Sequence, residues 1–232
     1  MRIELERVSH TFGDGSTART VLRDVTLTLT ERRIGVIGHN GSGKSTFLRL
    51  LNALIVPTSG RVLVDGLDTA RDARELRRRI GFLFTDPDAQ IIMPTVSEDI
   101  AFGLRRSGLS PERVDARVRD LLVRFGLDAH AGHPAHLLSG GQKQLLALAA
   151  VLITEPPALV MDEPTTLLDL SNAAMIGRVV ADLDQTVILA THHLDLLAGF
   201  DRVLVFHEGR VVADAPPAAA IAAYRHLMDP ES

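Results

Sequence analysis

The chain has 232 residues, of which 46% are hydrophobic and 23% are charged, a balance typical of one soluble globular domain. A formal charge of −4, with no block of five or six like charges, argues against nucleic-acid binding through a basic surface. No window holds 18 uninterrupted apolar residues, and the first residues lack the basic-then-apolar pattern of a secretory signal. These two features predict a cytosolic chain that neither spans a membrane nor is exported. The absence of cysteine excludes disulfides, thiolate metal ligands and cysteine nucleophiles.

Alternating apolar and polar residues predict antiparallel strands at 3–5 and 25–29, joined by a glycine-containing hairpin loop. A short buried strand at 34–37 comes next, followed by a glycine-rich turn and an apolar helix. Residues 61–66 predict another strand and turn, and the arginine-rich segment 72–80 predicts a solvated helix.

The middle of the chain is polar and helical in pattern. One predicted helix there has an apolar face formed by Val114, Val118, Leu121, Leu122 and Phe125. Buried strands are then predicted at 158–161, 186–191 and 202–206, separated by helical stretches, and an Ala-rich helix closes the chain. The pattern predicts an α/β fold over 1–232, with an N-terminal antiparallel β subdomain and a helical subdomain inserted at about 87–150.

Residues 38–45 fit the pattern GxxxxGK[ST] between a predicted strand and a predicted helix. Glycines let backbone N–H groups turn around phosphate oxygens, and the positive end of the following helix faces them. We expect Lys44 to bind the β- and γ-phosphates of ATP and Ser45 to bind Mg²⁺. The alternative is a glycine-rich turn with a solvated lysine. The predicted nucleotide-binding residues here are Gly38, His39, Asn40, Gly41, Ser42, Gly43, Lys44, Ser45 and Thr46.

Two carboxylates, Asp162 and Glu163, follow the apolar run 158–161 and should emerge at the carboxyl edge of a central strand. Because adjacent strand residues point to opposite sides, Asp162 is expected to bind the metal and Glu163 to act as the catalytic residue on an attacking water. The alternative is a turn that starts a helix, with Asp162 as its cap and Pro164 as its first residue.

A second glycine pair stands ahead of a helix in LLSGGQKQLLALAAVLI. Ser139 and Gln142 form an S-x-x-Q capping box, which is sufficient to explain both residues. Gly140 and Gly141, however, each cost about 1 kcal/mol of helix propensity in the first turn, which a cap does not require. A bare helix N-terminus of this kind suits an anion such as the γ-phosphate of ATP.

The segments GHNGSGKST, LSGGQKQ and LVMDEPT, in this order, resemble the nucleotide-binding subunit of an ABC transporter over nearly the whole chain. The resemblance implies a P-loop NTPase fold of the ABC ATPase type. It also implies that two such subunits pair head to tail, each nucleotide lying between one phosphate loop and Ser139, Gly140, Gly141 and Gln142 of the other. Closure on ATP and reopening after hydrolysis would then drive a membrane partner.

The resemblance also implies roles for three single residues outside these motifs. Phe12 matches the aromatic residue that stacks on adenine, although it could instead belong to the core. His192 matches the switch histidine at the γ-phosphate, and the neighbouring His193 is the competing assignment. Asp169 matches the acidic end of the loop that crosses to the partner subunit, or it caps a helix.

One departure concerns Thr85, which stands where the family usually has a glutamine after the strand GFLF. Gln90 follows in DPDAQIIMPTVSEDIAFGL, a segment similar to the ATPases of energy-coupling factor transporters, which import vitamins and transition-metal ions. That resemblance implies that Gln90 senses Mg²⁺ or water, or that it serves only the segment that docks the membrane subunit. Biotin-type transporters look most similar, and cobalt or nickel transporters come next.

The sequence therefore predicts an ATP-hydrolysing subunit, with ATP and Mg²⁺, on the cytoplasmic face of the cell membrane. Its expected partners are a second ATPase subunit, identical or paralogous, a transmembrane coupling subunit and a substrate-capturing membrane subunit. Soluble ABC proteins that work on nucleic acid usually carry tandem cassettes or a coiled-coil insertion, for which this chain has no room. A simple phosphoryl-transfer kinase would leave residues 139–142 unexplained.

Overall fold

The computed structural model describes residues 1–166 and 168–229, which fall into two compact units. Unit 1 consists of Met1–Ile80, Pro157–Glu163 and Leu183–Ser232, and unit 2 of Gly81–Pro156 and Pro164–Asp182. The second unit thus contains a segment after residue 150 in addition to the predicted helical insertion. Within the described ranges we find no helix with the length and apolar character that crossing a bilayer requires.

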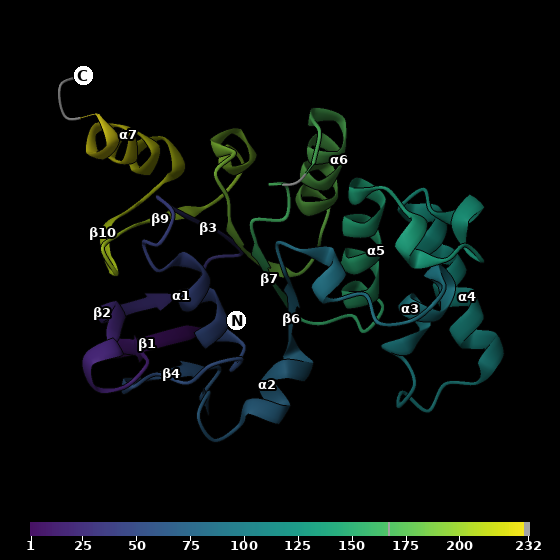
Figure 1. Cartoon of the computed structure of the whole chain (residues 1–232), viewed down its shortest axis with the longest axis horizontal. Helices are drawn as coiled ribbons and strands as arrows, with labels where there is room; N and C mark the ends of the chain where they lie inside the picture. Colours follow the sequence, from purple (N-terminus) through teal and green to yellow (C-terminus); the bar gives the residue numbers. More distant parts are fainter. Residues whose placement is uncertain (167, 230–232) are drawn as a thin grey trace. The chain divides into compact units, whose positions relative to one another are not determined.

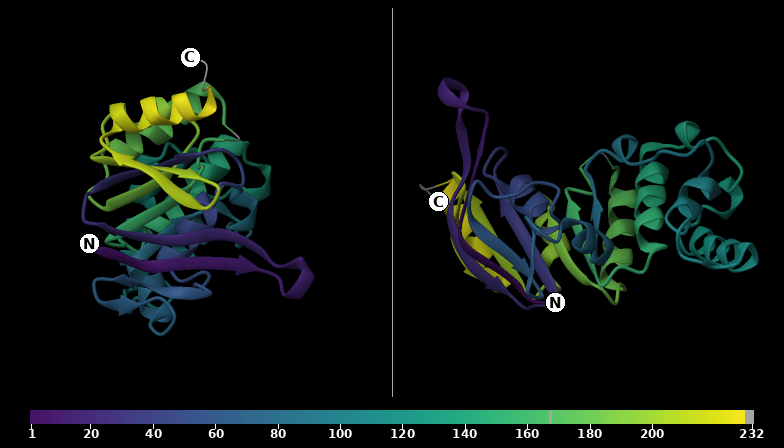
Figure 2. Two further views of the ribbon diagram at one scale, coloured as in Figure 1. Left: turned by 90° about the vertical axis from the view of Figure 1, so that its left-hand side faces the viewer. Right: turned by 90° about the horizontal axis from the view of Figure 1, so that it is seen from below.

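Unit 1 begins with an antiparallel sheet of four strands in the order β2-β1-β4-β5 (Figure 1). The strands are β1 (Ile3–Phe12), β2 (Arg19–Leu29), β4 (Ser59–Val64) and β5 (Leu67–Asp68). The predicted β1–β2 hairpin is confirmed, and its connection holds a short 3₁₀ turn, η1 (Gly15–Thr17). Figure 2 shows the end of this hairpin projecting from its sheet, where Phe12 pairs with Arg19.

A second sheet in unit 1 has the strand order β10-β9-β3-β8-β7. Its members are β3 (Arg33–Gly38), β7 (Ala158–Asp162), β8 (Thr186–Ala190), β9 (Arg202–His207) and β10 (Arg210–Ala215). Four of these strands are parallel, and each contains an apolar run that the sequence predicts to be a buried strand. Strand β10 joins antiparallel at the edge and was not predicted, because its residues alternate only between exposed and half-buried.

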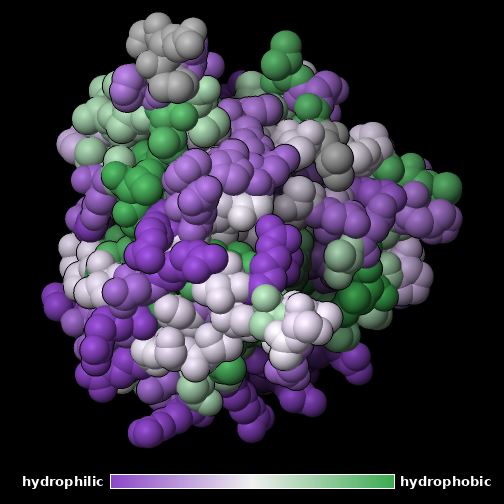
Figure 3. Space-filling view, turned by 60° about the vertical axis from the view of Figure 1, so that its left-hand side comes forward, coloured by the Kyte–Doolittle hydropathy of each residue, from purple (hydrophilic) through white to green (hydrophobic). Residues whose placement is uncertain are grey.

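Helix α1 (Lys44–Leu51) contacts strands of both sheets, and it buries Phe47 and Leu48 completely. The ring of Phe47 lies 5.0 Å from that of Phe206 on β9. Unit 1 also contains α2 (Ala73–Arg79), η5 (Leu194–Leu197) and α7 (Pro217–Met228). Because the apolar residues are enclosed in this way, the face in Figure 3 is mainly hydrophilic, with hydrophobic residues scattered over it.

Unit 2 is mainly helical. Its helices are η2 (Pro87–Ala89), α3 (Val96–Phe102), α4 (Pro111–Arg124), η3 (Asp128–His130), η4 (Ala135–Leu137), α5 (Gly140–Leu152) and α6 (Leu170–Ala181). Strand β6 (Ile80–Leu83) begins at the last residue of the preceding segment of unit 1. The predicted apolar face of α4 is confirmed at Val118, Leu122 and Phe125, each of which is buried.

Arg202 links the two sheets of unit 1. Its guanidinium donates to both carboxylate oxygens of Asp214 at 2.6 Å, to Glu31 at 3.0 Å and to the carbonyl oxygen of Thr28 on β2 at 2.8 Å. The hydrogen bond to Asp214 is the main reason that the pKa of Arg202 is raised. Burial alone would raise the pKa of Glu31, but hydrogen bonds from the Thr30 backbone and from Arg202 lower it. The cluster is partly buried, so solvent screens it less than it screens a fully exposed ion pair.

Replacing Arg202 by Ala is expected to lower the free energy of unfolding by about 1–3 kcal/mol, because several charge-assisted hydrogen bonds are lost together. The deficit should shrink as the pH falls through the acidic range in which Glu31, whose pKa is lowered in the folded chain, becomes protonated and contributes less stability in the parent chain as well. Chemical denaturation at several pH values measures both effects. As a control, Arg61→Ala breaks an exposed ion pair with Glu6 and should change little. Equal losses in the two variants would contradict the linking role of Arg202.

Candidate functional site

The loop between β3 and α1 is held close to neighbouring backbone on two sides. A Cβ on Gly38, whose φ is 152°, would collide with the carbonyl oxygen of Phe206 and lie 2.7 Å from Ser42 Oγ. A Cβ on Gly43, at φ 109°, would lie 2.8 Å from Leu22 Cδ2. The carbonyl oxygen of Ser42 also accepts a hydrogen bond of 3.0 Å from the backbone N–H of Gly209. The glycines in this turn are therefore required by packing as well as by backbone conformation.

Lys44 is the first residue of α1, and its side chain is only 4% exposed. Its ammonium group donates to the carbonyl oxygens of Gly38 at 2.8 Å and of His39 at 3.2 Å, and lies 3.4 Å from Glu163 Oε1. The alternative interpretation of a solvated lysine is therefore wrong. The loop folds around a fixed positive charge.

Ser45 and Asp162 come together from α1 and the carboxyl end of β7. The hydroxyl of Ser45 donates to Asp162 Oδ1 at 2.9 Å. Burial raises the pKa of Asp162, whereas the hydrogen bond from Ser45 opposes that shift. Because the pKa is raised in the folded chain, ionisation of Asp162 costs folding free energy that a nearby cation would offset. The helix-start alternative for Asp162 and Pro164 is wrong, since the next helix begins only at Leu170.

Glu163 follows β7 with a left-handed backbone conformation, φ 51°, which is uncommon for this residue type. Its Oε1 lies 2.8 Å from Nε2 of His192, and that same nitrogen lies 3.0 Å from Oδ1 of Asn40. Of the two adjacent histidines, His192 is thus the one that contacts the carboxylate. A chain of polar groups runs from the phosphate loop through His192 and Glu163 to Lys44.

A cavity of about 360 Å³ opens on these residues. It is lined by the phosphate loop, by Glu163 and, from the hairpin, by Phe12, Arg19 and Val21. Phe12 is 43% exposed, so the alternative that it belongs to the core is wrong. Its ring packs edge-on against His10, with centroids 4.5 Å apart, and Nδ1 of His10 is 2.9 Å from the carbonyl oxygen of Val56. An exposed aromatic ring therefore lines the same cavity as the phosphate loop.

Sequence reasoning missed Arg19 and Val21 as residues of this cavity. Neither belongs to a recognisable motif. The available signal was the hairpin itself: the first residues after the turn must lie beside Phe12 once the two strands pair.

In unit 2 the capping box at the start of α5 is confirmed. Ser139 Oγ accepts from the backbone N–H of Gln142 at 3.3 Å, and Gln142 Oε1 accepts from the N–H of Ser139 at 3.0 Å. Nε2 of Gln142 also lies 3.3 Å from Nε2 of His130. A Cβ on Gly141 would lie 2.5 Å from Cγ of Asn172 on α6. At Gly141, close approach by a residue of this same chain therefore explains the glycine.

Two other predicted positions, Gln90 and Asp169, also lie in unit 2. The amide of Gln90 donates to the carbonyl oxygen of Phe82 and accepts from the N–H of Phe84, both at 3.2 Å. The side chain of Gln90 therefore holds the segment that follows β6 against the backbone at the end of that strand. Asp169 caps α6 by accepting from the N–H of Asn172 at 2.8 Å. The adjoining Leu167 of the TTLLDL motif lies outside the described residues.

Gly141→Ala is expected to destabilise the chain by about 1 kcal/mol, because the methyl group collides with Asn172 and this outweighs the gain in helix propensity. In an Asn172→Ala background the same change should become neutral or stabilising. A double-mutant cycle of denaturation midpoints measures this coupling. Purely additive effects would show that Asn172 is not the reason for the glycine.

Comparisons with known proteins show which family this chain resembles. The family model described as ABC transporter matches residues 22–166. The biotin transport ATP-binding protein BioM of Rhizobium etli is 52% identical, over 98% of this chain and 99% of that protein. The energy-coupling factor transporter ATP-binding protein EcfA1 of Symbiobacterium thermophilum is 43% identical, over 90% of this chain and 77% of that protein.

Two solved structures share the fold over almost the whole chain. The structure of cbiO1 from Clostridium perfringens, part of the ABC transporter complex cbiONQ, is 32% identical with a TM-score of 0.81, covering 98% of this chain and 95% of that one. The ATP-binding cassette MJ0796, a dimer in a post-hydrolysis state bound to ADP and Pi, is 28% identical with a TM-score of 0.83, covering 93% and 98%. From its phosphate loop, its paired carboxylates and these matches, the chain belongs to the ABC transporter family, among its ATP-binding proteins.

Proposed function

We propose that this chain is the ATP-hydrolysing subunit of an energy-coupling factor importer, and that the imported solute is biotin. The proposal of ATPase activity rests on one observation: five polar side chains converge at the phosphate loop of unit 1. They are Lys44, Ser45, Asp162, Glu163 and His192. The relative named for biotin transport and the relative named for energy-coupling factor transport support the transporter type.

The residues present fit a magnesium nucleotide. Glycines let the loop turn its backbone N–H groups toward phosphate oxygens, and the close packing at Gly38 and Gly43 holds that turn in place. A hydroxyl and a carboxylate in contact, Ser45 and Asp162, form the hard oxygen pair that Mg²⁺ prefers. Bound Mg²⁺ supplies positive charge that neutralises the phosphate oxygens.

The side chains then have separate roles in hydrolysis. Lys44 holds its charge at a fixed point of the loop, where it stabilises negative charge on the β- and γ-phosphates. Glu163 accepts a hydrogen bond from a water aligned for attack on the γ-phosphate. His192 bridges Glu163 and Asn40, so that it orients the carboxylate and senses the phosphate. The exposed ring of Phe12 stacks on adenine.

Unit 2 contributes the surface for a second subunit. We assign Ser139, Gly140, Gly141 and Gln142 to the nucleotide held by the partner in a head-to-tail dimer. The related cassette MJ0796, which is itself dimeric, supports pairing of two subunits. The exposed start of α5 offers backbone N–H groups and a partial positive charge to a γ-phosphate. Gln90 keeps the segment after β6 in place for the membrane subunit, and we assign it no direct contact with Mg²⁺.

As the subunit of an importer, the chain binds peripherally to the cytoplasmic face of the cell membrane through a transmembrane coupling subunit. A substrate-capturing membrane subunit completes the complex. The solute is bound by that membrane subunit, so its identity is read from the complex rather than from the ATPase.

Glu163→Gln is expected to lower ATP hydrolysis by at least about 100-fold while leaving ATP binding intact, because the carboxylate that polarises water is lost while Lys44 and the loop that bind the phosphates remain. The variant should accumulate as an ATP-bound dimer, which size-exclusion chromatography with Mg-ATP measures. Lys44→Ala is the control and should remain monomeric, because it loses the phosphate contact. A Glu163→Gln chain that stays monomeric with ATP would contradict the shared site.

The transport proposal is tested by purifying the chain from gently solubilised membranes and identifying its partners by mass spectrometry. A transmembrane coupling subunit and a small membrane subunit that retains labelled biotin are expected. ATPase activity of the recovered complex should be lost in Glu163→Gln. Retention of cobalt or nickel ions in place of biotin would show that biotin is the wrong solute. Recovery of ribosomes or DNA without membrane subunits would overturn the transport proposal while leaving the ATP site intact.

A further inference from the structure

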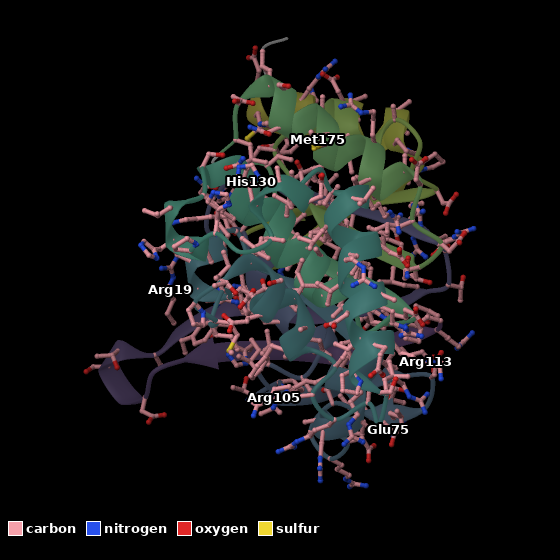
Figure 4. All side chains as sticks on the ribbon, turned by 90° about the vertical axis from the view of Figure 1, so that its right-hand side faces the viewer. Arg19, Glu75, Arg105, Arg113, His130 and Met175 are labelled. Atoms are coloured by element: carbon pink, nitrogen blue, oxygen red, sulfur yellow. The ribbon has the colours of Figure 1, made fainter. Side chains whose placement is uncertain are left out.

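Arg19 stands apart from the motifs that define the nucleotide cavity. It is the first residue of β2 and pairs in register with Phe12, the last residue of β1, across the end of the hairpin. Figure 4 shows it on that hairpin. Both side chains line the cavity of about 360 Å³ together with the phosphate loop. The hairpin thus brings one aromatic ring and one guanidinium group to the same opening.

The guanidinium also reaches the phosphate loop. One of its terminal nitrogens, Nη2, lies 3.7 Å from the place that a Cβ on Gly41 would take. Gly41 has φ 79° and is exposed at the turn of the loop, so nothing of its own covers this point. A phosphate oxygen bound at this turn would lie within reach of a charged donor that comes from a different sheet.

The charges of the cavity indicate what Arg19 adds. Among the described residues that line it, the cations are Arg19 and Lys44 and the carboxylate is Glu163, a sum of +1 that becomes 0 without Arg19. Lys44 is already close to Glu163, at 3.4 Å. Arg19, by contrast, makes no hydrogen bond or ion pair through its side chain within residues 1–166 and 168–229. Its five donors are therefore available to a ligand.

We propose that Arg19 is a further phosphate-binding residue of this site, which recognises the triphosphate chain of the nucleotide rather than its base or ribose. The proposal rests on the proposed ATP-binding function and deepens it. Guanidinium groups suit phosphate oxygens because their planar donors form paired, charge-assisted hydrogen bonds. With Phe12 on the base and Arg19 on the phosphates, the hairpin contacts both ends of the nucleotide.

The test measures affinities of the full chain for ATP, ADP and AMP by displacement of a fluorescent nucleotide, for which the absence of tryptophan gives a low background. Arg19→Ala is expected to weaken Mg-ATP binding about tenfold and AMP binding less than about twofold. Arg19→Lys keeps the charge but loses the paired donors, so its affinity for Mg-ATP should lie between those of the parent chain and Arg19→Ala.

Arg23→Ala is the matched control, because Arg23 is an exposed arginine of the same strand. It lines a neighbouring cavity together with Arg19 but does not line the nucleotide cavity. It should leave ATP affinity within about twofold of the parent. Equal losses for ATP and AMP in Arg19→Ala, or equal losses in the Arg19 and Arg23 variants, would overturn the assignment. Failure of the parent chain to bind any nucleotide would instead refute the proposed ATP-binding function.

Discussion

The candidate site depends on the close packing of the phosphate loop against the backbone of its neighbours. Gly38 lies against the carbonyl group of Phe206, and Gly43 lies against Leu22. The N–H of Gly209 bonds to Ser42, and its carbonyl oxygen accepts from Arg23 on β2. Residue 209 thus joins the loop to both sheets of unit 1. The orientation of the loop's N–H groups is therefore set by strands β2 and β9 and by the turn that contains Gly209, which reduces the ordering that binding would require.

The charges of the site are also arranged in advance. The buried ammonium of Lys44 has two carbonyl oxygens and a carboxylate close to it, so its desolvation is compensated in the nucleotide-free chain. Asp162 is less well compensated, because burial raises its pKa despite the hydrogen bond from Ser45. The site thus has a stable cation and a carboxylate that gains from a further cation. This asymmetry suits a ligand that brings phosphate oxygens and a metal ion together.

Much of this arrangement could be predicted from sequence because it is local. The phosphate loop, the carboxylates after β7 and the cap of α5 each depend on a few adjacent residues, and their patterns indicate both structure and chemistry. The hairpin could be predicted, but not the register that places Arg19 opposite Phe12, since that register depends on how the loop 13–18 folds. The edge strand β10 was missed because its apolar pattern is weak. From the sequence, only a ligand explained the glycine at position 141, because Asn172, which lies beside it in the structure, is far away in the chain.

The contact between Gly141 and Asn172 has a consequence for how such a sequence can change. Asp169 caps α6 by binding the N–H of Asn172, and the side chain of Asn172 occupies the space beside Gly141. Positions 141 and 172 therefore share one volume, and a larger residue at either requires a smaller one at the other. Neutral drift at these two positions has to be concerted. A library that varies the start of α5 without also varying residue 172 would discard substitutions that the helix itself tolerates.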